Sequence, residues 1–541
     1  MMERGPCRVC LTQTEHKCSG CQDVHYCTRE HQKQDWKQHK HQCVPARVKA
    51  DPTFGRYLEA TRDIKAGDII LKEKPLMNGP MQVTPPVCLG CYKLLEEGKT
   101  VDCIKCGWPC CSEACTLKED HIPECYYTQQ RGKKVSISTF GMPHPNYECI
   151  TTLRCLYQRD HNPKLWKKMQ AFQSHCEQRR GSEKWNNDRK MVVEFIWQFF
   201  KLEGTFTEEE IMRCCGVLQV NGHEVPLMEP EYLGLFDRMS MAEHNCCANC
   251  YKSFTSDGQI LLCAGVDIAA GSHVTLSYTD SMSGTGVRRR HLAQWFFECC
   301  CERCSDVTEF GTHYSAVKCK KKDCKGYLLP ETFVVPLLAK TTIPSPASKG
   351  WVCGGCKDMV SDDIIQQLLR DIDRELSVMP KGDPEACEKF IDQYSSYLHP
   401  SHYYMTNVRH ALAQTIGQES EKWLVGVTDD RLLLKTRLCR EIADLFRTLA
   451  PAEYRVRGYI LFELHAAIAE AGRRLSLIDG PTSSLLGYLV ESREILMTSA
   501  SLLRHEPPEL PEGRVLQQAR ANLVQLDELI RNLSRALPSP M

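Results

Sequence analysis

The residues with the clearest chemistry are cysteines and histidines that recur in pairs. The chain has 33 cysteines among 541 residues, and many stand two or three residues from another cysteine or histidine. A gap of two residues lets both thiolates face one ion from a tight turn, and a gap of three places both ligands on one face of a helix. Such spacing is typical of tetrahedral zinc sites. Isolated cysteines, such as Cys155, Cys176, Cys387 and Cys439, are interpreted as small buried hydrophobes.

The first cluster fills the N-terminal 45 residues and offers four ligand pairs, enough for two zinc ions. So short a segment cannot bury a useful apolar core, so we expect metal binding to supply its folding free energy. Its pairs are Cys7/Cys10, Cys18/Cys21, Cys27/His31 and His39/Cys43.

A second cluster repeats this arrangement between residues 88 and 125. Cys110 stands beside Cys111, so the register of the third pair is open by one residue. The expected pairs are Cys88/Cys91, Cys103/Cys106, Cys111/Cys115 and His121/Cys125.

The third cluster lies in FFECCCERCSD and supplies Cys299, Cys301 and Cys304. Three ligands leave a structural zinc site one short, so the fourth must come from elsewhere in the chain. Cys246 is our candidate for it.

A fourth cluster could hold one more ion, which would bring the chain to about six zinc sites. The alternative, a surface loop without zinc, stays open. The candidate ligands are Cys319, Cys324, Cys353 and Cys356.

Composition bounds the class of protein. Apolar residues make up 42% of the chain, charged residues 25%, and 68 basic residues balance 68 acidic ones. This balance gives no global charge that points to nucleic acid or to a membrane. The N-terminus lacks the apolar run of a secretory signal, and no stretch approaches the roughly 18 apolar residues of a membrane helix. We therefore expect a soluble, intracellular protein of several domains with reduced cysteines.

The patterning around the clusters predicts the elements that position them. Residues 55–76 and 259–278 alternate polar and apolar residues around KAGD and AAGS turns, which predicts strands. Residues 147–215 have a helical pattern. From residue 361 onward cysteines almost vanish, and helical segments separated by short turns predict a bundle of antiparallel helices.

The order of these pieces resembles the SMYD family of SET and MYND proteins, in particular its arthropod branch. Both N-proximal clusters resemble MYND fingers, in which pairs one and three share one ion and pairs two and four share another. His31 stands where that family usually has cysteine. The SET resemblance rests on the ordered segments GRYLEATRDIKAGDII, VNGHEV, MAEHNCCANC, VTLSYTD and CCCERC.

The resemblance implies an α+β fold with a β-rich SET core, interrupted by a zinc finger and a helical insertion. A further finger precedes this core, and a zinc-bound post-SET segment and an all-α, TPR-like domain follow it. The expected domains are a MYND-type finger at 1–46, the N-terminal part of the SET domain at 47–86, the embedded finger at 87–126, the helical insertion at 127–214, the SET core at 215–285, the post-SET segment at 286–360 and the helical domain at 361–541.

The resemblance also implies the reaction. In this family S-adenosylmethionine (SAM) binds on one side of the SET core, and a substrate lysine enters by a narrow channel from the other. Tyr278 falls on the catalytic tyrosine of the family. The positions that match cofactor-binding residues are Gly55, Arg56, Asn221, Glu243, His244, Asn249, Tyr278 and Phe297.

Three positions depart from the family pattern. The cofactor loop of the family matches residues 243–249 of this chain, where Glu243 replaces the first asparagine and Ala248 replaces a proline. Tyr57 stands where a second glycine is common in the N-terminal glycine motif. A carboxylate at 243 could accept a charge-assisted hydrogen bond from the cofactor ammonium, or it could oppose the cofactor carboxylate.

Two function classes follow. The first is SAM-dependent methylation of lysine on histones or other proteins. The second is a catalytically inactive scaffold whose MYND fingers bind transcriptional co-regulators in the nucleus or cytoplasm. A peptide-binding surface on the first finger would place Gln22, Gln34 and Trp36 on one exposed face, although we expect Trp36 in the small core of this finger. Direct DNA binding is disfavoured, because no finger has groove-reading geometry.

Overall fold

A sheet near the middle of the chain brings together strands that are far apart in the sequence. In this computed structural model, which describes residues 4–21, 24–40, 43–52, 55–334, 350–418, 422–480 and 482–537, β14 (His273–Leu276) lies between β4 (Gly55–Ala60) and β11 (Glu243–His244). β3 (Ala46–Asp51) pairs with the other edge of β4. β11 runs parallel to β14, and this pairing places the predicted cofactor loop beside the strand that leads to Tyr278.

The second sheet contains a strand with only apolar side chains, and the position of this strand explains its composition. β13 (Ile260–Ala264), with the sequence ILLCA, is buried at every position. Leu261 and Cys263 face the C-terminal helices, and the alternate side chains join the main core. A strand covered on both faces loses the usual alternation of polar and apolar residues. Its sheet also contains β12 (Cys250–Phe254) and β5 (Ile69–Glu73), and a third sheet contains β6 (Met77–Pro80), β10 (Tyr232–Leu235) and β9 (Gly222–Val225).

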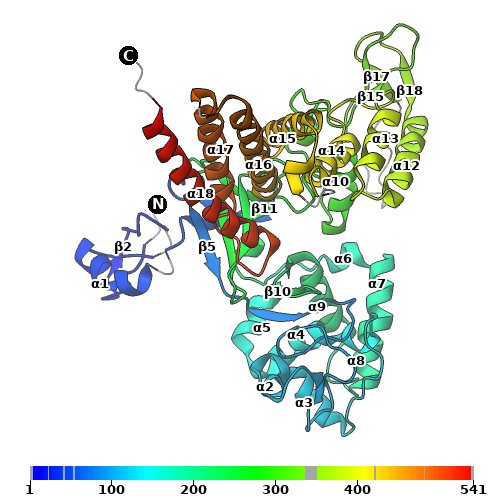
Figure 1. Cartoon of the computed structure of the whole chain (residues 1–541). Coiled ribbons are helices and arrows are strands. Elements are labelled where there is room, and N and C mark those ends of the chain that lie inside the picture. The colour runs from blue at the N-terminus through cyan, green and yellow to red at the C-terminus, as the bar shows by residue number, and fades with distance from the viewer. Residues whose placement is uncertain are drawn as a thin grey trace.

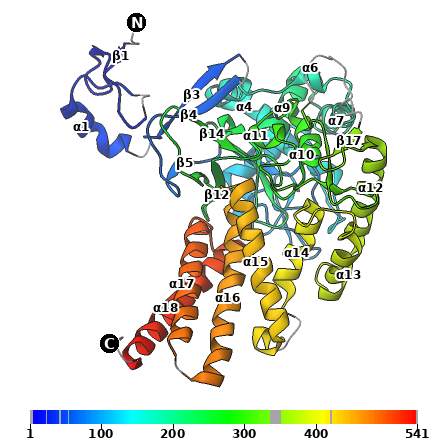
Figure 2. The ribbon, with the colours of Figure 1, turned by 90° about the horizontal axis from the view of Figure 1, so that it is seen from above.

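The two Cys/His-rich segments form separate small units. The first projects from one side of the molecule in both views (Figures 1 and 2), and the Thr61 hydroxyl donates a hydrogen bond of 2.5 Å to the Gly20 carbonyl at its base. Its elements are β1 (Gly5–Pro6), β2 (Gln13–Thr14) and α1 (Arg29–His39). The second contains β7 (Val101–Asp102), β8 (Pro109–Cys110), α2 (Glu113–Thr116), η1 (Glu119–His121) and α3 (Ile122–Arg131).

A helical layer follows the second unit and supplies much of the main core. Its last helix, α9 (Glu208–Asn221), begins with a capping box in which the side chains of Thr207 and Glu210 accept from each other's backbone N–H groups. The preceding elements are η2 (Pro145–Tyr147), α4 (Ile150–His161), α5 (Pro163–Gln170), α6 (Cys176–Arg179), α7 (Glu183–Asp188), η3 (Arg189–Val193) and α8 (Glu194–Phe199).

Short elements carry the last two cysteine clusters. Near the central sheets these are η4 (Met239–Met241), α10 (Thr285–Leu292), η5 (Ala293–Trp295) and α11 (Glu302–Ser305). A separate antiparallel sheet follows, with β15 (Val317–Lys318), β16 (Tyr327–Pro330), β17 (Gly350–Cys353) and β18 (Met359–Ser361) in that order.

The C-terminal part is helical, as predicted, and its last four long helices lie side by side (Figure 2). It packs against the central sheets, where the Tyr454 ring lies 3.8 Å from that of Tyr251 and its hydroxyl donates to the Lys252 carbonyl. The helices are α12 (Asp362–Val378), α13 (Pro384–Tyr394), α14 (Tyr403–Thr415), η6 (Trp423–Gly426), α15 (Asp429–Leu449), α16 (Tyr454–Asp479), α17 (Ser483–Leu502) and α18 (Pro511–Ala536).

The predicted strands at 55–76 and 259–278 and the predicted helices at 147–215 are present. The division into domains stays a prediction. The boundaries placed at 46/47, 285/286 and 360/361 fall inside β3, α10 and β18, and those placed at 126/127 and 214/215 fall inside the helices α3 and α9. Both helices continue because their apolar faces pack into one core with the central sheets. Within the described ranges, none of the helices combines the length and apolar character needed to cross a membrane.

Candidate functional site

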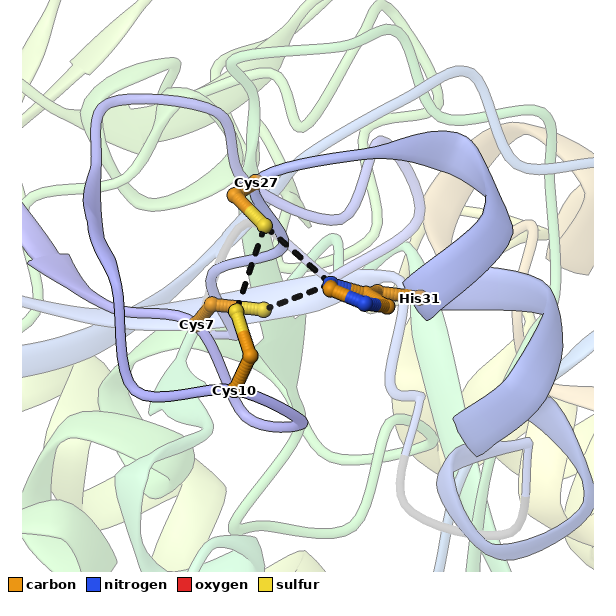
Figure 3. A group of neighbouring side chains, drawn as sticks. All are labelled: Cys7, Cys10, Cys27 and His31. Carbon is orange, nitrogen blue, oxygen red and sulfur yellow. Dashed lines mark hydrogen bonds between the residues drawn. The ribbon is translucent and has the colours of Figure 1, made fainter.

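The first zinc-ligand set of the N-terminal finger joins a knuckle to a helix. Cys7, Cys10, Cys27 and His31 converge, and the Nδ1 of His31 lies 3.1 Å from the Cys27 sulfur and 3.6 Å from the Cys7 sulfur (Figure 3). His31 is held in the first turn of α1, where its backbone N–H donates to the N-cap Thr28. Histidine therefore occupies the fourth ligand position without distorting the helix.

The second set of this finger contains Cys18, Cys21, His39 and Cys43. The sulfurs of Cys18 and Cys43 are 3.7 Å apart, and the Nε2 of His39 is 3.6 Å from the Cys21 sulfur. Pairs one and three thus meet, as do pairs two and four, in the interleaved order that the family resemblance implies.

Trp36 does not lie in the core of this finger, contrary to our expectation. Its side chain is 44% exposed on α1. Cysteine ligands and Tyr26 fill the small core, which leaves no space for an indole. Gln34 is exposed as well, and Gln22 lies outside the described residues.

The embedded finger brings its predicted ligands together in the same interleaved order. Cys111, and not Cys110, belongs to the first set, since the Cys111 sulfur lies 3.5 Å from Cys91 and 3.6 Å from Cys115. The two sets are Cys88, Cys91, Cys111 and Cys115, and Cys103, Cys106, His121 and Cys125.

A buried ion network fixes the histidine of the second set. The Nε2 of His121 lies 3.3 Å from the Cys106 sulfur, and its Nδ1 lies 3.0 Å from a carboxylate oxygen of Glu124. Arg154 on α4 holds this carboxylate with hydrogen bonds of 2.8 and 3.0 Å. The Arg154 guanidinium, though opposed by burial, keeps the pKa of Glu124 below its ordinary value. Such a carboxylate orients a metal-binding imidazole and links the finger to the helical layer.

The third cluster is completed by Cys246, whose sulfur lies 3.5 Å from that of Cys304 and 3.9 Å from that of Cys299. With Cys301 these residues form a set of four thiols. The cofactor loop and the segment at 299–304 are therefore joined through one ligand set. A zinc ion held by four thiolates carries a net negative charge, which the surroundings must balance.

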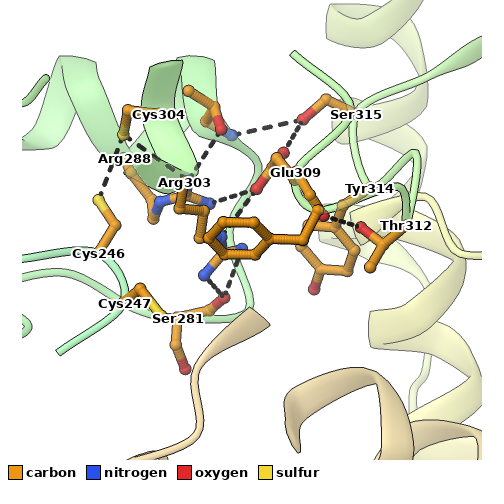
Figure 4. Close-up of polar contacts among 12 residues, drawn as sticks. Cys246, Cys247, Ser281, Arg288, Arg303, Cys304, Glu309, Thr312, Tyr314 and Ser315 are labelled. Atoms are coloured by element: carbon orange, nitrogen blue, oxygen red, sulfur yellow. Dashed lines mark hydrogen bonds and ion pairs between the residues drawn. The ribbon is translucent and has the colours of Figure 1, made fainter. Parts of the chain in front are cut away.

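Two buried arginines lie beside this set. The Arg288 guanidinium is 3.9 Å from the Cys304 sulfur and 3.1 Å from the carboxylate of Glu309, to which Arg303 also donates at 2.9 Å (Figure 4). All three side chains are fully buried. The positive charges of the two arginines exceed that of the single carboxylate and offset the negative charge of the thiolates.

The fourth cluster brings four thiols together between the loops of the separate sheet. The Cys319 sulfur lies 3.7 Å from Cys356, and the Cys324 sulfur lies 3.6 Å from Cys353. Each thiol of the pair Cys319/Cys324 thus meets one thiol of the pair Cys353/Cys356. This arrangement fits a single ion with tetrahedral coordination.

Tyr278 lies two residues after β14, beside the third cluster. Its hydroxyl donates to the Ala242 carbonyl at 2.5 Å, and its backbone N–H donates to the Nδ1 of His244 at 3.0 Å. The rings of Trp295 and Phe297 lie 5.6 and 6.4 Å from its own. Burial, assisted by the Glu243 carboxylate, raises the pKa of Tyr278 well above its ordinary value, so the hydroxyl stays protonated.

Two of the departures from the family pattern meet at one histidine. The Nδ1 of His273 contacts a carboxylate oxygen of Glu243 on the neighbouring strand. The imidazole of His273 also stacks on the ring of Tyr57, with centroids 4.1 Å apart and planes 15° apart. The other carboxylate oxygen of Glu243, Oε2, is buried and has no hydrogen-bond partner among the described residues.

Other predicted cofactor residues make structural bonds. Asn249 joins the loop to β14, because its amide donates to the His273 carbonyl at 2.7 Å and its oxygen accepts from the Thr275 N–H at 2.9 Å. The side-chain amide of Asn221 donates to the carbonyls of Gln173 and Val217. The side-chain oxygen of Asn249 and both amide hydrogens of Asn221 are therefore already engaged within the protein.

Three predicted positions remain. Arg56 donates to the Ala171 carbonyl at 2.6 Å, so it ties β4 to the helical layer. Gly55 has a φ of +71°, a conformation that favours glycine. Phe297 is 36% exposed and lies 5.8 Å from the ring of His244.

The sequence reasoning missed His273, Trp295 and Arg288. The aromatic run QWFFE before the third cluster is a signal that could have identified Trp295. Neither His273 nor Arg288 has a local motif, because each acts on a partner brought close only by folding.

The comparisons with known proteins agree with this arrangement. The SET domain model matches residues 55–279, and the MYND finger model matches residues 7–43. The fruit fly SET domain-containing protein SmydA-8, isoform A, is 26% identical over 65% of this chain and 71% of its own length. Histone-lysine N-methyltransferase ASHR1 of Arabidopsis thaliana is 22% identical over 87% of this chain and 94% of its own length. Human histone-lysine N-methyltransferase SMYD1 is 24% identical over 46% of this chain and 54% of its own length.

The chain therefore contains a MYND finger and a SET domain, and its sequence is similar to those of SMYD proteins, an arthropod one among them. Its α+β fold, Cys/His zinc-binding clusters and helical C-terminal part agree with that similarity.

SAM, the cofactor that this family implies, can be tested against the residues present. Its methionine part carries a cationic ammonium, and the buried Oε2 of Glu243 is an acceptor that such a donor would satisfy. Tyr57, which stands where the family commonly has glycine, stacks its ring on His273. The larger side chain at this position is therefore packed against a residue of the protein. On these two points the residues fit the group.

Proposed function

We propose that the protein is a SAM-dependent protein-lysine methyltransferase that acts on histone or other protein substrates. The observation that carries this proposal is the placement of Tyr278. It lies in a SET domain between the cofactor loop and aromatic rings, beside a set of four thiols.

SAM supplies the methyl group. The Oε2 of Glu243 would accept from its ammonium, and Phe297 would pack against it. Tyr278 has a protonated hydroxyl held by the Ala242 carbonyl, which leaves oxygen lone pairs to orient the reacting groups. Trp295 and Phe297 provide apolar surface that excludes water.

The substrate lysine must be neutral to attack. Its ordinary pKa is about 10.4, so a protonated ammonium dominates in water. Burial against aromatic rings disfavours the charged form and lowers this pKa. Alignment of the amine with the methyl group, together with exclusion of water, supplies most of the remaining acceleration.

The experiment is transfer of a labelled methyl group from SAM to core histones and to a mixture of cellular proteins. We expect labelled lysine with the natural protein and a loss of at least about a hundredfold with Tyr278→Phe. The matched control is Tyr488→Phe, because Tyr488 is exposed on α17 far along the chain. Equal labelling by Tyr278→Phe and the natural protein would overturn the proposal.

Peptide binding by the first finger is a second candidate function, favoured by the exposed Trp36. We infer that this indole contacts short peptides of transcriptional co-regulators, in the nucleus or the cytoplasm. Trp36→Ala should then abolish binding of a proline-containing co-regulator peptide, whereas Lys33→Ala on the same helix should leave most of it. Unchanged binding by Trp36→Ala would exclude this role for the indole.

Zinc holds this architecture together, and we infer six ions per chain. Five ligand sets are those of the two fingers and the post-SET segment, and the sixth is the fourth cysteine cluster.

A further inference from the structure

His244 occupies the space between the third zinc-ligand set and the predicted catalytic tyrosine. Its Nε2 lies 3.2 Å from the sulfur of Cys246, and its Nδ1 lies 3.0 Å from the backbone nitrogen of Tyr278. No other described side chain is recorded with hydrogen bonds to both a thiol of this set and Tyr278.

The two contacts fix which ring nitrogen carries the proton. A backbone N–H can only donate, so the Nδ1 of His244 must accept from Tyr278 and cannot carry a hydrogen. The proton of the neutral ring is therefore on Nε2, which points at Cys246. A zinc-bound thiolate is an acceptor, so both contacts are hydrogen bonds of the correct polarity.

His244 is not itself a ligand of this ion. The four cysteine sulfurs of the set lie within 4.8 Å of one another, so together they can complete the tetrahedral coordination of one ion. The imidazole stands outside this set and binds one of its members, as outer groups do when they orient metal ligands.

The surroundings leave His244 little freedom to move. β11 pairs with β14 at His244 and Leu276, and the next backbone N–H, of Asn245, donates to the Leu276 carbonyl at 2.9 Å. The ring lies 5.3 Å from that of Tyr278 and 5.8 Å from that of Phe297. We therefore expect a displacement of Cys246 to move the backbone of Tyr278, because the ring of His244 has little room to rotate.

We propose that His244 is a positioning residue that couples the zinc-bound sulfur of Cys246 to the backbone of Tyr278, so that an intact zinc centre sets the place of that tyrosine. The consequence for catalysis rests on the proposed methyltransferase function. The coupling itself is a property of the free protein and can be measured without cofactor or substrate.

The test is hydrogen exchange at the Tyr278 amide, followed by mass spectrometry on zinc-loaded protein. In His244→Phe the ring remains and both hydrogen bonds are lost, so this amide should exchange about tenfold faster with zinc content unchanged. His244→Gln, which can both donate and accept, should restore part of the protection. His291→Gln is the matched control, because His291 is exposed on α10 and is recorded with no contact to Cys246 or Tyr278.

The second arm removes a ligand. Cys304→Ser should accelerate exchange at Tyr278 in the natural background but add little to His244→Phe, since the link is already absent. Equal effects of Cys304→Ser in both backgrounds, or unchanged exchange in His244→Phe, would overturn the proposal. Exchange of the α16 amides reports whether each variant is folded. If His244→Phe does not fold, the comparison of His244→Gln with the natural protein still tests the proposal. Coupled exchange in a protein without methyl transfer would refute the proposed function alone.

Discussion

The Nδ1 of His273 contacts a carboxylate oxygen of Glu243 across the neighbouring parallel strands β11 and β14. The same histidine stacks on Tyr57, so two of the three residues that depart from the family pattern share one partner. Tyr57 and Glu243 are 186 positions apart in the sequence, yet the structure makes them a single unit. A change at one of them therefore cannot be judged without the other.

The contact between Glu243 and His273 should contribute to the free energy of unfolding. His273→Ala leaves the half-buried carboxylate of Glu243 without this partner, and we expect a loss of about 1–3 kcal/mol in the free energy of unfolding. Chemical denaturation measures this loss. The double variant Glu243→Asn/His273→Ala should recover part of it, because no charge is then left behind. Asp267→Asn, which breaks an exposed pair with Lys65, should cost far less than His273→Ala. Equal losses of unfolding free energy in His273→Ala and Asp267→Asn would contradict a stabilising contact between Glu243 and His273.

The embedded finger offers a second test. Glu124→Gln leaves the buried charge of Arg154 uncompensated and weakens the orientation of His121. We expect a loss of about 3–5 kcal/mol in stability and a roughly 10- to 100-fold drop in zinc affinity. Denaturation and competition with a chelator measure the two effects. Glu96→Gln is the control, since its pair with Lys99 is exposed. Full zinc retention by Glu124→Gln would argue against the orienting role.

The C-terminal helices should make stability depend on pH. Burial, with a smaller contribution from His399, lowers the pKa of His402 from 6.5 to about 3, and burial lowers that of His465 to about 4. The unfolded chain then binds protons before the folded one does, so stability is full above about pH 6.5 and falls as the pH drops toward 4.

The dependence of the free energy of unfolding on pH has an upper limit, and a variant at His402 can test it. Each such histidine contributes up to about 1.4 kcal/mol per pH unit in this window. The Nδ1 of His402 accepts from the Tyr404 N–H at the start of α14, and asparagine can replace that cap without titrating. Denaturation of His402→Asn between pH 7 and 4.5 should therefore show a shallower loss than the natural protein. An identical slope would show that His402 is protonated in the folded state.

Zinc content tests the ligand sets directly. We expect six ions per chain by atomic absorption, and five after the double variant Cys319→Ser/Cys356→Ser. Cys439→Ser is the control, because Cys439 is a buried thiol of the helical domain outside every proposed set. Six ions in the double variant would show that the fourth cluster is not a zinc site.

The zinc fingers could be predicted from the sequence because their ligands are close neighbours, and spacing alone fixes which thiols can share a face. The ligand count at 299–304 predicted a fourth ligand from elsewhere in the chain, and our candidate, Cys246, meets Cys304 in the structure although no local pattern joins the two. The choice of Cys111 over Cys110 depended on the path of the backbone after β8, which spacing leaves open.

The cofactor site was harder to predict because its polar groups have competing partners. Asn249 and Asn221 match the family motif, but strands and helices of the fold engage their side chains. Trp36 was expected in a core, yet the cysteine ligands leave that core too small for it. Such outcomes depend on which groups folding brings together, and a linear pattern does not contain them.

Titration calorimetry of SAM with the zinc-loaded protein decides whether this SET domain holds its cofactor. We expect the natural protein to bind SAM with a Kd on the order of micromolar. We expect Glu243→Asn to weaken this binding by roughly 10-fold or more, because the charged acceptor for the ammonium is lost. Absence of binding by the natural protein, with binding gained in Glu243→Asn, would contradict the account and identify a methyltransferase fold switched off at one residue.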